Sequence, residues 1–145
     1  MLTEKDYCDY DTCVALKELK YNRGAYAYYF PNHKEDLIFN THQMRGCSIN
    51  EMVKGYNTYP SDVMGHELID APTMWEAQKW LREDKKINVF VRAGYLENRV
   101  RHYYVEVFTS NDVITLDNNR EDYDSYEEAL LAGIKEAIKI LKEEK

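Results

Sequence analysis

The sequence predicts an α+β fold, in which three to four helices pack on a mainly antiparallel sheet of about five strands. The length of 145 residues is typical of a single domain, with residues 1–70 and 71–145 as its candidate substructures. Segments with the 3.6-residue period of a helix alternate with segments that have the two-residue period of a strand. Ser/Thr-x-x-Glu capping boxes, which mark helix starts, begin at Ser48, Thr73 and Ser125.

Two helices are predicted in the first half of the chain. The first covers residues 9–21, with Asp9 or Asp11 as the N-cap, because a short acidic side chain accepts a hydrogen bond from the first turn. Gly24 follows its end, as is typical of a helix C-terminus. The second is a short amphipathic helix over residues 48–56, after which the periodicity is lost.

A hairpin is predicted between these two helices. In residues 25–30 the alternation places Tyr26 and Tyr28 toward the core and leaves Tyr29 on the outer face. Residues 36–40 provide the return strand.

The second half predicts a terminal α-β-β-β-α order. Its middle strand places His102, Tyr104 and Glu106 on one face, because side chains of a strand alternate between faces. The segments are a helix over residues 73–85, strands over residues 87–91, 102–108 and 113–116, and a helix over residues 125–141.

The charge balance argues against nucleic acid as the partner. The chain has 19 Lys and Arg against 26 Asp and Glu, for a net charge of −7, whereas binding to nucleic acid depends largely on basic side chains that neutralise phosphate. Among the 145 residues are 13 tyrosines, which provide large, rigid contact area with a hydroxyl group. An acidic, tyrosine-rich surface favours a protein partner with a basic surface.

The N-terminus and the cysteines indicate a cytoplasmic protein. Residues 1–11 carry four acids and no apolar core of a signal peptide, and no apolar run approaches the length of a membrane span. Cys8, Cys13 and Cys47 are odd in number and lack CxxC spacing, which is typical of reduced thiols.

No catalytic residue, cofactor or metal site is predicted. Residues 66–70 (HELID) have aspartate where the HExxH zinc motif needs its second histidine. Residues 117–128 match several positions of a calcium loop, but Asp122 replaces the glycine of the sharp turn. We interpret these acids as favourable charges at the start of the last helix.

Three segments carry a resemblance to a family. Residues 71–73 (APT), 80–83 (WLRE) and 123–134 (YDSYEEALLAGI) resemble a group of small proteins from gut anaerobic bacteria and their phages, to which no activity is assigned. The resemblance implies a shared architecture and an origin on a mobile element, and it identifies no functional residue. The C-terminal element order is also similar to that of double-stranded RNA-binding domains, but Asp122 and Asp124 lie where those domains carry lysines.

The leading hypothesis is a non-enzymatic protein-interaction module, such as a phage-type regulator or inhibitor of a host protein. Helical geometry places Trp75 on the polar side of its helix, where either residues 57–72 fold back and cover it or it is an exposed anchor for a partner, which would support this hypothesis. The alternative is a small-molecule or nucleotide-binding protein, which predicts a closed pocket lined by tyrosines and a histidine. A homodimer is a further expectation if a strand edge stays open. The interaction candidates are Trp75, Tyr95, His102, Tyr104, Glu106, Asp122 and Asp124.

Overall fold

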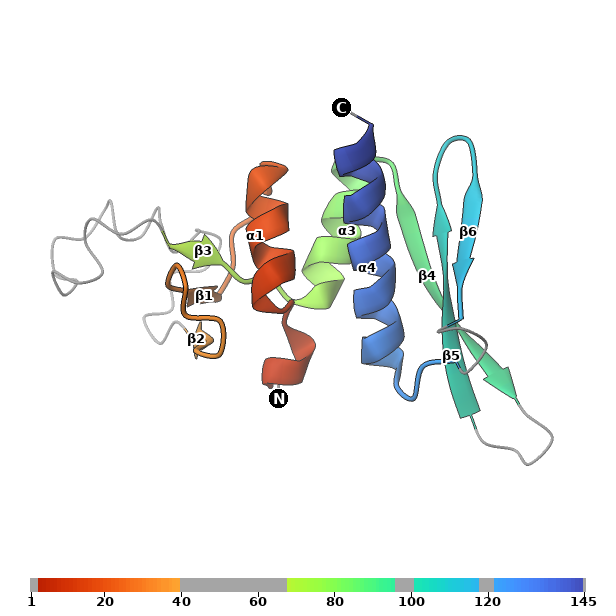
Figure 1. Cartoon of the computed structure of the whole chain (residues 1–145), viewed down its shortest axis with the longest axis horizontal. Coiled ribbons are helices and arrows are strands. Elements are labelled where there is room, and N and C mark those ends of the chain that lie inside the picture. The colour runs from red at the N-terminus through yellow and green to blue at the C-terminus, as the bar shows by residue number, and fades with distance from the viewer. Residues whose placement is uncertain (1–2, 40–67, 96–100, 118–121, 145) are drawn as a thin grey trace, which may run out of the picture. The chain divides into compact units, whose positions relative to one another are not determined.

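A computed structural model describes residues 3–39, 68–95, 101–117 and 122–144 (Figure 1). The predicted helix over residues 48–56 lies outside the described residues, as do Cys47 and the first two residues of the HELID segment, His66 and Glu67. Tyr95 is described by its backbone alone.

The chain divides into two compact units, Met1–Glu76 (unit 1) and Ala77–Lys145 (unit 2). The α+β class is confirmed. The single sheet of about five strands is not, because the described residues form two antiparallel sheets of three strands each, accompanied by three α-helices. Alternation along a chain predicts that a strand exists, whereas the choice of its partner depends on residues far away in the sequence.

Unit 1 is built on a sheet with the strand order β2-β1-β3. Asp9 caps its helix, since the Thr12 amide donates to Oδ1 of Asp9 at 3.0 Å. Its elements are a 3₁₀ turn η1 (Glu4–Asp6), α1 (Tyr10–Glu18), β1 (Ala27–Tyr29), β2 (Ile38–Phe39) and β3 (Ile69–Asp70).

The prediction that Tyr26 points to the core and Tyr29 to the outer face is wrong for both residues. Tyr26 precedes the strand and is 42% exposed, and Tyr29 is buried like its neighbours Ala27 and Tyr28. The reason is that β1 is the central strand of a small sheet and is covered on both faces. The ring of Tyr29 packs edge-on against Tyr10 of α1, with 5.4 Å between the ring centroids.

The helix α3 (Met74–Asp84) begins in unit 1 and continues into unit 2, and its predicted capping box is present. The Thr73 amide donates to Oε1 of Glu76 at 2.9 Å, and the Glu76 amide donates to Oγ1 of Thr73 at 3.2 Å. The last helix is capped in a similar way, since the Glu128 amide donates to Oγ of Ser125 at 3.1 Å.

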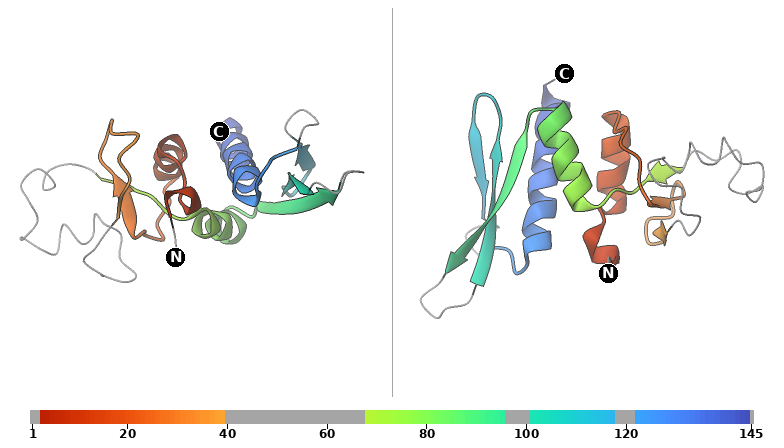
Figure 2. Two further views of the ribbon diagram at one scale, coloured as in Figure 1. Left: turned by 90° about the horizontal axis from the view of Figure 1, so that it is seen from below. Right: turned by 180° about the vertical axis from the view of Figure 1, so that it is seen from behind.

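Unit 2 contains the sheet β4-β5-β6, with α4 lying along β4 and β5 (Figures 1 and 2). The face toward α4 carries the buried residues Val89, Val105 and Val107. The backbone of α4 comes very close to this face at Gly133, where a Cβ would lie 2.5 Å from Cγ1 of Val89. The bounds are β4 (Asn88–Tyr95), β5 (Arg101–Phe108), β6 (Val113–Leu116) and α4 (Tyr126–Glu143).

Candidate functional site

The sheet of unit 2 has a second face, which points away from α4 and which we call the open face. Side chains alternate along each strand, so the residues between the buried valines point to this side. The register pairs Phe90 with Glu106, Arg92 with Tyr104, and Phe108 with Val113 across the strands. The open face is formed by Asn88, Phe90, Arg92, Gly94, His102, Tyr104, Glu106, Phe108, Val113 and Thr115.

One end of the open face is apolar. Phe90 is 45% exposed and Val113 is 55% exposed, although both are large hydrophobic residues. The rings of Phe90 and Phe108 meet edge to face, with 5.5 Å between the centroids. These neighbouring side chains therefore present apolar surface to solvent.

The centre of the open face carries an ion pair. Nε of Arg92 donates to Oε1 of Glu106 at 2.8 Å, and the guanidinium lies 6.0 Å from the centroid of the Phe90 ring. The cation is thus held between a carboxylate and an aromatic face, which limits the rotamers of all three side chains. The open face thus combines an apolar end with an oriented ion pair at its centre.

The other end of the open face gathers His102, Tyr104 and Asp122 around Gly94. A Cβ added at Gly94 would lie 3.7 Å from Oδ2 of Asp122 and 4.0 Å from Cδ1 of Tyr104. Backbone pairing of Tyr103 with Tyr123 anchors the segment that carries Asp122, with N–H to O distances of 3.0 and 2.7 Å. Asp122 itself adopts a φ of 57°, which turns the chain toward this end of the face.

His102 adds a polar atom to this end. Its Nδ1 is buried and has no hydrogen-bond partner within the described residues. A buried polar atom without a partner costs free energy, and because this atom is buried, a molecule docking on the open face would reach it only if neighbouring side chains moved.

The open face brings together four of the sequence candidates: His102, Tyr104, Glu106 and Asp122. Asp124 is exposed beyond the Tyr103–Tyr123 pairing, and Trp75 lies in unit 1 with 38% of its surface exposed. The sequence reasoning missed Phe90, Arg92, Phe108 and Val113. The alternation within residues 87–91 and 102–108 indicated which side chains of each strand share a face. It could not show which residues of the two strands lie opposite each other, because that depends on the register between the strands.

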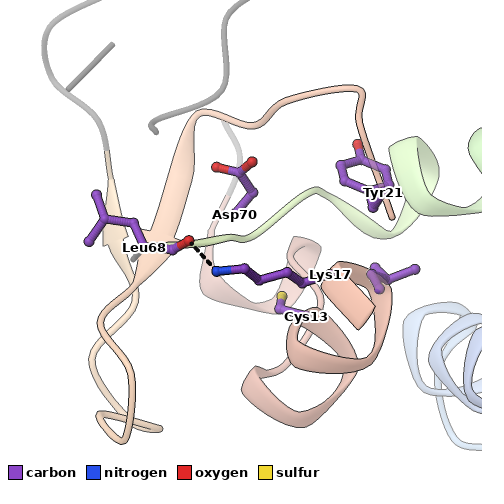
Figure 3. Close-up of a pocket in the computed structure, with 6 residues that line it drawn as sticks. Cys13, Lys17, Tyr21, Leu68 and Asp70 are labelled. Atoms are coloured by element: carbon purple, nitrogen blue, oxygen red, sulfur yellow. Dashed lines mark hydrogen bonds between the residues drawn. The ribbon is translucent and has the colours of Figure 1, made fainter. Parts of the chain in front are cut away.

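A second candidate site is a pocket of about 120 Å³ in unit 1 (Figure 3). The ammonium of Lys17 donates to the carbonyl oxygen of Leu68 at 3.2 Å, and the Tyr21 hydroxyl donates to the carbonyl oxygen of Gly24 at 3.2 Å. In contrast to the predicted pocket of tyrosines and a histidine, its lining contains one tyrosine and no histidine. The lining residues are Cys13, Leu16, Lys17, Tyr21, Leu68 and Asp70.

Burial keeps two of the lining groups uncharged. The pKa of the Cys13 thiol is well above its usual value, mainly because burial disfavours the thiolate and also because Cys8, Asp9 and Asp70 are nearby. The pKa of Tyr21 is also raised, first by burial and then by the negative charge of Glu76. Cys13 is therefore a poor nucleophile, and Lys17 and Asp70 supply the charges of the pocket.

The described residues contain neither a metal-ligand cluster nor a helix that could span a membrane. No group of three or more His, Cys, Asp or Glu side chains within them is placed to hold a metal ion. Part of the calcium-like segment, residues 118–121, lies outside them. None of the helices in the described part of the chain combines the length and apolar composition needed to cross a bilayer. Comparison of the chain with protein families, curated proteins and solved structures finds no match.

Proposed function

We propose that this chain is a non-enzymatic protein-binding module and that the open face of β4, β5 and β6 is its contact surface. The supporting observation is the exposure of Phe90 and Val113 beside Phe108 and the Arg92–Glu106 pair. Aromatic residues and arginine are the side chains that most often dominate binding energy at protein interfaces. Here they are held by the strands, so binding requires little further ordering.

The partner that fits this face is a protein with an apolar patch bordered by Lys or Arg. The arginine of the face is already bonded to Glu106, and the chain as a whole carries a net charge of −7. An acidic protein attracts a basic partner over distances of about a Debye length, which speeds the encounter. The sequence resembles proteins of bacteria and their phages, which favours the proposal that the module regulates or inhibits a host protein.

Replacement of Phe90 by the photo-cross-linking residue p-benzoylphenylalanine tests the proposal in the native cell. We expect a specific cross-link to one partner, which is then purified and titrated against the full chain. Phe90→Lys should weaken that binding by about tenfold or more, because it removes apolar area and adds a positive charge opposite a basic partner.

The matched control is Tyr26→Lys, which changes an equally exposed aromatic residue of unit 1. We expect it to leave the affinity unchanged. Equal losses in the two variants would contradict the assignment of the open face. A purified chain of twice the expected mass that Phe90→Lys converts to a monomer would assign the face to self-association and not to a different protein.

A further inference from the structure

We propose that the pocket of unit 1 binds a small zwitterion, an α-amino acid of the size of glycine or alanine, between Lys17 and Asp70. This site is separate from the open face and does not depend on the function proposed for it. The carboxylate of the ligand would lie at the Lys17 ammonium, and its amino group at the Asp70 carboxylate.

The pocket brings opposite charges from two elements together. Lys17 comes from α1 and Asp70 from β3, and both line the same space (Figure 3). The hydrogen bond from Lys17 to the Leu68 carbonyl orients the ammonium. An ammonium has three donors and a carboxylate about four acceptor sites, so each group can serve a ligand in addition to its partners in the protein.

The size of the pocket limits the ligand to a few atoms. The volume is about 120 Å³. Sites for drug-sized ligands begin at about 300 Å³, so this pocket is too small to enclose a nucleotide. Leu16 also lines the space and can contact a hydrogen or methyl side chain of the ligand, whereas Leu68 turns its carbonyl oxygen toward Lys17 (Figure 3).

The charge of the lining selects a ligand without net charge. Lys17 contributes one positive charge and Asp70 one negative charge, while Cys13 and Tyr21 remain neutral because burial raises the pKa of each. A ligand with a single charge would leave one of these two groups without a ligand contact of opposite sign. The Tyr21 hydroxyl donates its hydrogen to Gly24, so toward a ligand its oxygen acts as an acceptor, which suits an ammonium group.

Titration of the full chain with glycine and with L-alanine, followed by two-dimensional NMR, tests the proposal. We expect saturable shifts of the Cys13, Lys17 and Asp70 amides with dissociation constants of about a millimolar, as befits so few ligand atoms. Acetate and methylammonium, which each carry one of the two charges, should bind at least about tenfold more weakly. L-phenylalanine should bind more weakly than L-alanine, because the pocket cannot enclose its side chain.

Two variants that preserve side-chain shape locate the site. Asp70→Asn and Lys17→Met should each weaken L-alanine binding by about tenfold or more, because each removes one charge-assisted hydrogen bond. The control is Lys34→Met, an exposed lysine of the same unit outside the pocket, which should have no effect.

Three results would overturn the proposal. The first is the absence of saturable shifts with both amino acids up to about 20 mM, a concentration well above the expected dissociation constant. The second is binding that Asp70→Asn and Lys17→Met leave unchanged. The third is acetate binding as tight as that of L-alanine to the unaltered chain, which decides the question even if a variant fails to fold.

Discussion

At the scale of single residues, the buried tyrosine of β1 predicts a pH dependence of stability. Burial, reinforced by Cys13, raises the pKa of Tyr29 to about 12 from an ordinary value near 10. Between these values the unfolded chain loses the Tyr29 proton while the folded unit keeps it. The free energy of unfolding should therefore fall as pH rises from about 10 to about 12, by on the order of 2 kcal/mol from this group.

Urea unfolding at a series of pH values, followed by the fluorescence of Trp75 and Trp80, measures this dependence. Tyr29→Phe should flatten it, because phenylalanine has no proton to lose. Tyr26→Phe serves as the control, since Tyr26 is exposed and should leave the dependence as it is. An alkaline loss of stability that persists unchanged in Tyr29→Phe would contradict the assignment.

At the scale of elements, the close approach of α4 to its sheet predicts that Gly133→Ala destabilises unit 2. The added Cβ would lie 2.5 Å from Cγ1 of Val89 and 2.6 Å from Cγ2 of Val105, closer than real atoms come. Such overpacking costs about 1–3 kcal/mol, which outweighs the gain of about 1 kcal/mol in helix propensity. Chemical denaturation of the full chain measures the difference.

Two further variants separate packing from helix propensity. Lys139→Ala changes an exposed position of the same helix and should leave stability within about 0.5 kcal/mol. Val89→Ala combined with Gly133→Ala should cost less than the sum of the two single variants, because the truncated side chain opens space for the new methyl group. If Gly133→Ala proves as stable as the unaltered chain, α4 does not lie as close to β4 and β5 as described.

The same elements show which parts of the fold the sequence predicts. The capping box at Thr73 is confirmed by both of its hydrogen bonds, and Ser125 is confirmed as the N-cap of the last helix, because a helix start depends on four consecutive residues. The facing of Tyr26 and Tyr29 was wrong because β1 has three residues and is buried on both faces, so alternation carries no signal there.

The candidate site also has parts that the sequence predicts and parts that it does not. Alternation along β5 was sufficient to place His102, Tyr104 and Glu106 on one face, as the register confirms. The approach of Asp122 to Gly94 was not predictable, because a loop with a left-handed residue brings it there. The pocket of unit 1 was missed entirely, since Lys17 and Asp70 meet only through the packing of α1 and β3.

At the scale of the whole molecule, the net charge of −7 predicts how binding to the partner responds to salt. Electrostatic attraction to a basic partner mainly accelerates association, and added salt screens it. We expect the association rate constant to fall by about tenfold between low and high ionic strength, while the dissociation rate constant changes little. Surface plasmon resonance with the partner identified by cross-linking at Phe90 measures the two rate constants separately.

Charge should affect mainly the association rate constant, and apolar contact mainly the dissociation rate constant. Two variants distinguish these contributions. Asp112→Asn removes an exposed charge beside β6 and should reduce the salt dependence with little effect on dissociation. Val113→Ala removes apolar area from the open face and should accelerate dissociation while the salt dependence stays the same. An association rate that is independent of salt would exclude a basic partner, and the apolar end of the open face would then account for recognition by itself.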